Sequence, residues 1–435
     1  MTPPPKAAVA ATEAGPLSLA APSALREVLA RGRVRAAIAI LGPAFVASVA
    51  YVDPGNFATN FAAGAEHGYL LVWVIVMANL MAMVVQYLAS KTGLTTGQSL
   101  PELCSAHFSR RWNLLLWLQA EAIAMATDLA EFVGAALGLN LVFHLPLFTA
   151  GLVTAVVAFG ILALEQRGYR RFELAIMGLL AIVAGGFLVD LLSVGNQSPS
   201  GIVHGLVPHL GGGDTIGLTV GIIGATVMPH VVYLHSALQK ARIRPTNARE
   251  TRTLLRYNRF DVIVGLGLAG IVNLSMLCIA AALFHRPGLS GIHDLGPIHS
   301  HLATLVGGGT ALAFGVALMA SGFSSSSVGT YAGQIVMAGF MQWRIPLVVR
   351  RGVTMLPSLA VLALSVNPSS ALIISQIVLS FGIPFALVPL TLVTGRRDIM
   401  GEYVNRRSTA AAMWAITGII SLLNLYLVAR TLFGL

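Results

Sequence analysis

Long apolar runs recur along the whole of this 435-residue chain and limit its possible folds more than any other feature. A helix needs about 20 apolar residues to cross the hydrocarbon core of a bilayer. Eleven candidate spans lie at 37–66, 70–90, 112–140, 146–165, 173–195, 214–240, 260–284, 302–322, 346–366, 371–394 and 410–432. The end of the eighth span is open, because the serine-rich stretch SGFSSSSVGTYAGQ could extend that helix or break it. The sequence therefore predicts an all-α membrane protein with eleven transmembrane helices.

Composition excludes the main competing classes of protein. Hydrophobic residues make up 56% of the chain and charged residues only 10%, against roughly 25% charged residues in a soluble domain. The regular alternation of outer-membrane strands is absent. Cys104 and Cys278 form neither a disulfide framework nor a CxxC metal motif. We find no HExxH, nucleophile elbow or P-loop, so we expect no enzyme activity and no cofactor.

The net charge of +10 reports orientation and not a nucleic-acid partner. With a cytoplasmic N-terminus, 25 of the 27 basic residues, all but Arg286 and Arg430, fall on the cytoplasmic side of the predicted spans. The opposite orientation would violate the positive-inside rule almost everywhere. We therefore expect residues 1–36 to be a cytoplasmic tail and the C-terminus to lie outside. We expect membrane lipid as a partner and no nucleic acid.

Two of the predicted spans carry a proline next to polar residues at their centres. The first contains DPGN, starting at Asp53, and the sixth contains MPH, starting at Met228. Each proline frees the carbonyl four residues before it, at Ala50 and at Ala225. A freed carbonyl in hydrocarbon needs water, protein or an ion as a partner. Ordinary proline kinks are the alternative interpretation.

The two interruptions lie five spans apart, and this spacing favours an inverted repeat. An odd shift reverses the direction of corresponding helices, and broken helices at matching positions of two such halves indicate a transport site at the membrane midplane. We therefore predict repeats at 37–195 and 196–394, with the eleventh helix in 395–435. The halves share no convincing sequence identity, so the prediction depends on the breaks and the span count.

The residue types at the breaks favour a divalent cation. Asp53 supplies a charge that is expensive at mid-membrane, and Asn56 supplies an amide oxygen. Met228 supplies a thioether, which favours softer transition metals over magnesium and calcium. Gln376 in the tenth span is a further oxygen donor. Core packing for Met228 and a helix–helix hydrogen bond for Gln376 are the alternatives.

The third span carries three carboxylates, Glu121, Asp128 and Glu131. Steps of seven and three residues place them within an arc of about 80° on one face of a helix. A buried acidic stripe of this kind is typical of proton relays. Arg350 and Arg351, at the cytoplasmic start of the ninth span, could neutralise it, and a structural ion pair is the alternative role.

At these residues the chain resembles the Nramp family of proton-coupled divalent-metal transporters, in particular the bacterial manganese/proton symporters. The resemblance is carried by DPGN at Asp53–Asn56, MPH at Met228–His230, ATDLAEF at Ala126–Phe132 and the pair Arg350–Arg351. It covers nearly the whole chain after the tail. Either short motif alone is weak, whereas both together, five spans apart, are specific.

The resemblance implies a leucine-transporter-like 5+5 inverted repeat plus one helix, in a bacterial inner membrane. It implies import of Mn²⁺ or Fe²⁺, and also Cd²⁺ and Co²⁺, with protons and by alternating access. The implied metal ligands are Asp53, Asn56 and Met228, the alternating carbonyls of Ala50 and Ala225, and Gln376 in an occluded state. The implied proton route runs from Asp53 through Asp128, Glu131 and Glu121 to Arg350 and Arg351, with His230 supporting the site. We expect a monomer.

Two other functions fit parts of the sequence. A sodium-coupled amino-acid symporter of the same architecture would need an unwound segment that grips a substrate carboxylate through backbone N–H groups. Here that segment itself carries an anion, Asp53. A metal channel would need no alternating access, and saturable turnover separates a carrier from it.

Overall fold

The structure is a computed structural model, and it describes residues 24–30, 32, 40–166, 169–195, 197–209, 211–212, 214–289, 292–343 and 345–433. Every regular element within these ranges is a helix. In chain order they are α1 (Ala24–Ala30), α3 (Pro43–Ala50), α4 (Pro54–His67), α5 (Val72–Thr96), α6 (Leu100–His107), α7 (Arg110–Phe143), α8 (Leu147–Gln166), α9 (Tyr169–Val194), α10 (Pro199–Gly205), α11 (Asp214–Thr226), α12 (Pro229–Arg242), α13 (Ala248–Phe284), α14 (Leu295–Leu305), α15 (Gly308–Met341), α16 (Leu347–Ala363), α17 (Pro368–Gly395), α18 (Arg397–Met400), η1 (Gly401–Tyr403) and α19 (Arg407–Phe433).

The predicted all-helical membrane fold is confirmed, whereas the number of spans agrees only in part. Nine helical stretches of the described chain are long and apolar enough to cross a membrane, with α11 and α12 counted as one. The two predicted spans missing from this set are the first, which is divided into α3 and α4, and the ninth, α16, which is 17 residues long. The count of eleven stays a prediction. Most of the predicted N-terminal tail lies outside the described residues.

The bounds predicted for the eighth span, 302–322, are wrong. This part of the chain forms a short helix, α14, followed by α15, which is a single helix of 34 residues. The serine-rich stretch does not break α15, because its hydroxyls bond back to carbonyls one turn earlier. Ser324 Oγ lies 2.8 Å from the Ala320 carbonyl oxygen, and Ser327 Oγ lies 2.8 Å from that of Phe323. This internal pairing removes the cost of placing hydroxyls in a membrane helix.

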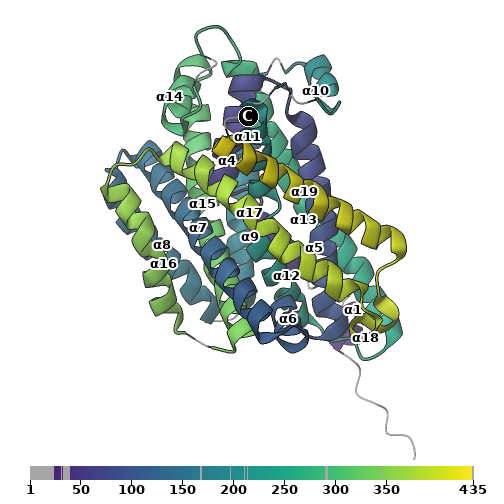
Figure 1. Ribbon diagram of the computed structural model, residues 1–435. Coiled ribbons are helices and arrows are strands. Elements are labelled where there is room, and N and C mark those ends of the chain that lie inside the picture. Colours follow the sequence, from purple (N-terminus) through teal and green to yellow (C-terminus); the bar gives the residue numbers. More distant parts are fainter. Residues whose placement is uncertain are drawn as a thin grey trace, which may run out of the picture.

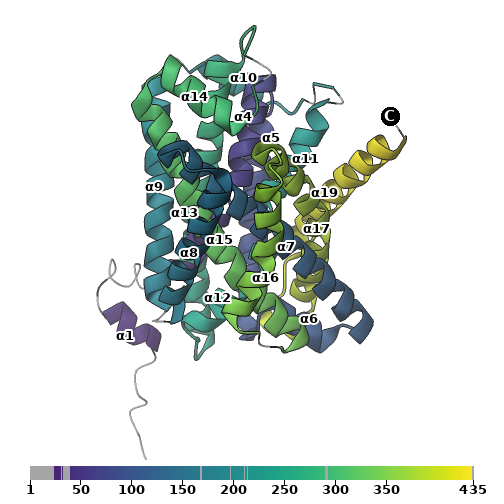
Figure 2. The ribbon, with the colours of Figure 1, turned by 90° about the vertical axis from the view of Figure 1, so that its left-hand side faces the viewer.

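The two broken helices lie inside the bundle, and each half of one packs against one half of the other. α4 contacts α11, and α3 contacts α12. The long helices α7, α13, α15 and α17 surround them, while α8, α16 and α19 lie at the periphery (Figures 1 and 2). α1, α6 and α18 lie at the lower end of the bundle, and α10 and α14 lie at the upper end.

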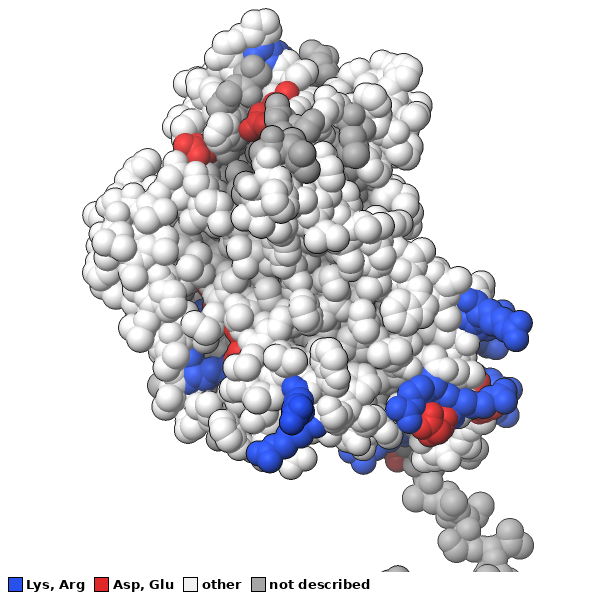
Figure 3. All heavy atoms as spheres, viewed as in Figure 1, with Lys and Arg blue, Asp and Glu red and all other residues white. Residues whose placement is uncertain are grey.

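Charged side chains are distributed unevenly between these two ends. Figure 3 shows Lys and Arg gathered at the lower end of this face, below a broad belt that is almost free of charge. The belt matches the apolar zone that a bilayer covers, and the side of the membrane that the basic end faces stays a prediction.

Aromatic packing anchors α4 to the surrounding helices. The ring centroid of Phe57 lies 5.0 Å from that of Phe187 on α9, in an edge-to-face arrangement. Phe61, one turn later, lies 5.2 Å from Phe314 on α15. Such pairs favour edge-to-face contact because the positive ring edge meets the negative face of its partner. These four phenylalanines hold α4, the helix that Asp53 caps, in place against α9 and α15.

Candidate functional site

The first break lies between α3 and α4, where the sequence predicts it. Asp53 is the N-cap of α4 in an extended conformation, with φ −81° and ψ 168°. Its Oδ1 accepts the backbone N–H of Asn56 over 2.8 Å, as an N-cap carboxylate should. Pro54 occupies the first helical position, where its missing N–H costs nothing. The same residues that end α3 therefore restart the chain as α4 and aim the carboxylate into the bundle.

Carbonyls of the short connection between α3 and α4 accept hydrogen bonds from side chains of other helices. Asn273 Nδ2 on α13 donates to the Tyr51 carbonyl over 2.8 Å, and Ser321 Oγ on α15 donates to that of Val52 over 2.5 Å. These bonds remove the cost of unpaired carbonyls in a dry interior. Asn273 and Ser321 are supporting residues that the sequence analysis missed.

The second break separates α11 from α12. Met228 is the extended N-cap of α12, with φ −77° and ψ 120°, and Pro229 starts the helix. Met228 is completely buried. The Ala225 carbonyl accepts Asn56 Nδ2 over 3.0 Å, so a side chain of the first break contacts the backbone of the second.

The two breaks and α17 meet at one carboxylate. Asn56 Nδ2 lies 2.7 Å from Asp53 Oδ1, and Gln376 Nε2 lies 3.3 Å from Asp53 Oδ2. We call the set Asp53, Asn56, Ala225, Met228 and Gln376 the central site, and its side chains are fully buried. It is therefore closed toward both ends of the bundle.

The central site has unused coordinating atoms. Among the described residues, Asn56 Oδ1 and Gln376 Oε1 are buried side-chain atoms without a hydrogen-bond partner. Their N–H groups are the ones that contact Asp53. A half turn of each amide would bring both oxygens to the carboxylate, giving an oxygen-rich site for a cation in place of the amide protons. Buried unpaired acceptors are otherwise costly and rare.

A cation here would depend on mixed donors. The described residues contain no group of three or more His, Cys, Asp and Glu side chains arranged to hold a metal ion. Asp53 is the single carboxylate of the central site, so the remaining donors are amide and carbonyl oxygens and the Met228 thioether. Amide and carbonyl oxygens suit hard divalent ions, whereas the thioether suits softer ones.

Glycines allow the helices to approach this closely. A Cβ on Gly55 would lie 1.8 Å from Gln376 Nε2, and a Cβ on Gly134 would lie 2.0 Å from Pro54 Cβ. On α11, a Cβ on Gly224 would lie 2.1 Å from the Gln376 carbonyl oxygen. Since that last obstacle is backbone, it cannot rotate away.

Replacing Gly224 by alanine is therefore expected to destabilise the protein by about 1–3 kcal/mol, the usual cost of overpacking a core. Gly217→Ala on the same helix is the matched control, because a Cβ at Gly217 meets nothing within 4 Å. Thermal unfolding of both variants in detergent measures the difference. Equal melting temperatures would contradict the close approach of α11 and α17.

The acidic stripe of α7, Glu121, Asp128 and Glu131, lies beside α16. Glu121 Oε2 forms an ion pair of 2.6 Å with Arg350 Nη2, and Asp128 Oδ1 forms one of 3.4 Å with Arg351 Nη1. Glu131 is fully buried, and neither of its carboxylate oxygens has a hydrogen-bond partner in the described chain. The structure thus brings the two arginines to two members of the stripe and leaves the third, one turn from Asp128, unpaired.

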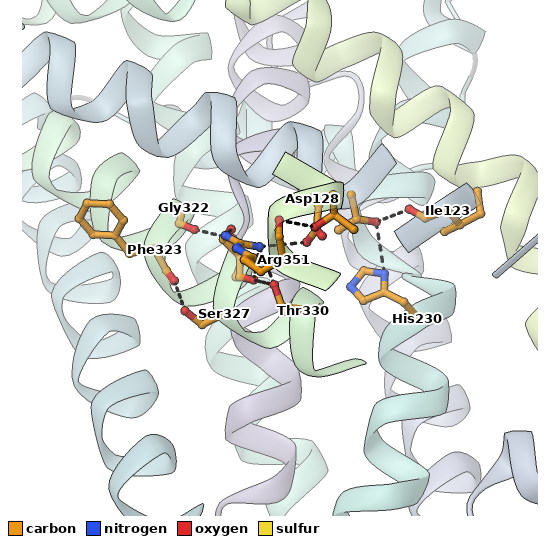
Figure 4. A network of polar contacts seen from close by, with 12 residues as sticks. Ile123, Asp128, His230, Gly322, Phe323, Ser327, Thr330 and Arg351 are labelled. Carbon is orange, nitrogen blue, oxygen red and sulfur yellow. Dashed lines mark hydrogen bonds and ion pairs between the residues drawn. The ribbon is translucent and has the colours of Figure 1, made fainter. Parts of the chain in front are cut away.

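Arg351 is completely buried and links three helices (Figure 4). Besides Asp128 on α7, its guanidinium contacts α15, donating to Thr330 Oγ1 over 2.5 Å and to Ser326 Oγ. Buried guanidinium groups need such multiple partners. The polar path from Asp128 therefore continues through Arg351 between α15 and α16.

His230 lies near both the central site and the acidic stripe. Its Nδ1 is 3.4 Å from Thr127 Oγ1 on α7 (Figure 4). Its Nε2 is buried without a hydrogen-bond partner in the described residues. His230 follows Pro229 at the start of α12, so it connects the second break to the helix that carries the stripe.

A second polar chain was not predicted. Gln86 Nε2 on α5 donates to Tyr51 Oη over 2.6 Å, and Gln86 Oε1 lies 2.9 Å from His235 Nδ1 on α12. Tyr51, Gln86 and His235 are fully buried. These hydrogen bonds connect both broken helices to α5. The available sequence signal was an amide and an imidazole inside apolar runs, the same signal that singled out Gln376 and His230.

The chain matches a family model described as natural resistance-associated macrophage protein-like, Nramp, over residues 44–430. It is similar to proteins named divalent metal cation transporter MntH. That of Deinococcus radiodurans is 50% identical over 401 residues, covering 92% of each chain. That of Bacillus subtilis is 44% identical over 398 residues, covering 91% of this chain and 93% of the relative.

The chain is also similar in fold to solved structures. A manganese transporter of Eremococcus coleocola, in complex with an aromatic bis-isothiourea substituted compound, has a TM-score of 0.82 at 31% identity, covering 90% of this chain and 86% of that chain. MhsT in complex with L-phenylalanine has a TM-score of 0.59 at 14% identity, covering 88% of this chain and 97% of that chain. At this identity, the similarity to MhsT shows the fold alone.

Proposed function

The chain belongs to the Nramp family, and from this premise we propose that it is a proton-coupled importer of Mn²⁺ or Fe²⁺ that works by alternating access. The family identifies a multi-pass divalent metal cation transporter and not an enzyme. The preferred ions, with Cd²⁺ and Co²⁺ as further cargo, and the coupling to protons are our proposal.

The observation that carries the choice of cargo is the donor set of the central site. One buried carboxylate, Asp53, meets two amides with unpaired oxygens, Asn56 and Gln376. Met228 adds a thioether at the second break. A single negative charge with neutral oxygens and a sulfur favours a divalent transition metal over calcium. The carbonyls of Ala50 and Ala225, freed by the prolines, complete the proposed set as the breaks move.

We propose that protons use the acidic stripe. A proton released from Asp53 when metal binds passes to Glu131 and Asp128, and leaves toward the lower end along Arg351, Arg350 and Glu121. His230 supports the junction between the central site and the stripe. The unpaired carboxylate of Glu131 supports this route, because a relay needs a group that is free to gain and lose a proton.

The proposed topology follows the basic residues. The lower end of the bundle, with α1, α6 and α18, faces the cytoplasm, and α19 ends on the outside. Two inverted repeats, 37–195 and 196–394, rock against each other around the central site, and 395–435 supplies the extra helix. A monomer is sufficient for this mechanism.

A metal-competition assay tests the proposal. Liposomes that contain the purified chain and an internal manganese-sensitive dye are assayed at an external pH of about 5.5 and of about 7.5, on either side of the ordinary histidine pKa of about 6.5. We expect saturable Mn²⁺ uptake that Fe²⁺ and Cd²⁺ inhibit, Ca²⁺ does not inhibit, and an inward proton gradient accelerates. Uptake proportional to Mn²⁺ concentration without saturation would indicate a channel instead.

The thioether has its own test. Met228→Ala is expected to keep manganese uptake within about tenfold while admitting calcium, because the soft ligand discriminates between ions more than it binds manganese. Met276→Ala is the matched control, since Met276 is equally buried but lies on α13. Radioactive calcium uptake measures the effect. Continued exclusion of calcium by Met228→Ala would contradict the role given to sulfur.

A further inference from the structure

An apolar groove opens between α7 and α17 on the outside of the bundle, away from the central site. It encloses about 510 Å³. Its walls are formed mainly by large apolar side chains and two prolines, with polar groups only at one end. The lining residues are His107, Phe108, Ser109, Trp112, Leu116, Pro384, Phe385, Val388, Pro389 and Leu392.

The groove begins just after the last close contact between α17 and α7. At Gly382 the two helices touch, because a Cβ there would lie 2.6 Å from Ile123 Cγ1 and 2.7 Å from Gln119 Nε2. Pro384 and Pro389 follow within two turns, and proline inside a helix removes a hydrogen bond and bends the axis. Beyond the contact at Gly382, the two helices leave a wedge that Pro384 and Pro389 line.

The bend is a stable part of the fold. The carbonyls released by the prolines, at Ser380 and Phe385, both have partners from neighbouring helices. Asn424 Nδ2 on α19 donates to the Ser380 carbonyl over 3.1 Å, and Tyr233 Oη on α12 donates to that of Phe385 over 3.3 Å. Since both freed carbonyls are satisfied, the wedge does not close by straightening of α17.

In the proposed topology, the groove lies at the boundary between lipid and cytoplasm. Its residues belong to the last turns of α17, which ends at Gly395, to the first turns of α7, which starts at Arg110, and to the connection from the end of α6 at His107. Trp112 is 63% exposed and Phe385 is 47% exposed. Tryptophan at a helix end is typical of a membrane interface. At this depth the surrounding medium is the acyl region and headgroups of the inner leaflet.

At the polar end of the groove, a basic pair lies between the lining residues Ser109 and Trp112 in the sequence. Arg110 and Arg111 are exposed, and no ion pair among the described residues includes either of them. Ser109, the N-cap of the 34-residue helix α7, makes no capping hydrogen bond through its side chain, and the first N–H groups of a helix favour anions. The nearby carboxylate of Asp398 is neutralised by Arg396, at 2.5 Å.

We propose that this groove binds one anionic phospholipid of the cytoplasmic leaflet. An acyl chain fills the wedge between Leu116 and Val388, and the phosphate sits at Arg110 and Arg111, whose guanidinium groups suit bidentate phosphate contacts. Basic clusters between transmembrane helices at the cytoplasmic side recognise such headgroups. The bound lipid would contact α17, the helix that carries Gln376.

Native mass spectrometry of the full chain, delipidated and then supplied with phosphatidylglycerol or phosphatidylcholine, tests the proposal. We expect phosphatidylglycerol to be retained at least about tenfold better, and Arg110→Gln/Arg111→Gln to remove that preference, because basic residues at the membrane surface attract anionic headgroups. Arg406→Gln/Arg407→Gln, an exposed pair of equal charge at the start of α19, is the matched control and should behave like the native chain.

A second variant separates the groove from its charges. Val388→Trp fills the wedge and leaves Arg110 and Arg111 in place, so it should lose the bound phosphatidylglycerol as well. Manganese uptake by the same samples shows that each variant is folded. Equal retention of both lipids by the native chain would overturn the proposal, as would equal loss in the Arg406/Arg407 control or full retention in Val388→Trp.

Discussion

Asp53→Asn is expected to reduce manganese uptake by at least about 100-fold, because even partners of metal ligands commonly cost 10–100-fold when removed. Asparagine keeps the shape and the N-cap role of Asp53, so α4 should still begin at Pro54. What it removes is the only carboxylate of the central site, and with it both the charge that holds a divalent ion and the proton that metal binding displaces. Uptake into proteoliposomes and metal binding by calorimetry should fall together.

Asp190→Asn is the matched control for this substitution. Asp190 is another fully buried aspartate of the bundle, and its carboxylate oxygens have no hydrogen-bond partner among the described residues, but it lies on α9, outside the central site. We expect its variant to transport manganese within about threefold of the native rate, as for most substitutions away from a site. Loss of uptake in both variants would mean that removing any buried carboxylate impairs transport, and it would not support a specific role for Asp53.

Glu131→Gln is expected to separate proton movement from metal binding. Proton entry that accompanies manganese should fall at least about tenfold, since a positioned side chain commonly accelerates proton transfer by roughly 10²–10⁴-fold. Manganese affinity should change by less than about threefold, because no hydrogen bond or ion pair among the described residues joins Glu131 to the central site. A pH-sensitive dye inside the liposomes measures the proton flux beside the metal flux.

The stability of Glu131→Gln serves as an internal check. Glu131 is buried without a hydrogen-bond partner in the described chain, so an isosteric neutral side chain should not lower the melting temperature. Glu402→Gln, at an exposed carboxylate 3.6 Å from Arg252, is the control for removal of a negative charge. An unchanged ratio of protons to manganese in Glu131→Gln would contradict the route through α7.

Sequence reasoning reached the fold class and the two breaks because both follow from local chemistry. Apolar runs of membrane length predict spanning helices, and a proline beside Asp53 or Met228 predicts an interruption wherever it stands in such a run. Gln376 emerged for a related reason, since an amide at membrane depth needs a partner. The structure brings it to Asp53.

Other features depend on packing and could not be derived in this way. The eighth span was misplaced because hydropathy alone does not reveal that the hydroxyls of Ser324 and Ser327 are paired within α15. The pairing of Arg350 with Glu121, and of Arg351 with Asp128, required the arrangement of α7 and α16. The role of Gly224 depends on the backbone of Gln376, a neighbour on another helix that is distant in the sequence.

The most direct test of the central site is an anomalous-scattering map of crystals grown with Mn²⁺. We expect one strong peak within coordination distance of Asp53, Asn56 and Met228, with the amide of Asn56 turned so that its oxygen faces the ion. A transport-competent protein whose manganese peak lies away from Asp53 and Met228 would contradict the site proposed for this transporter.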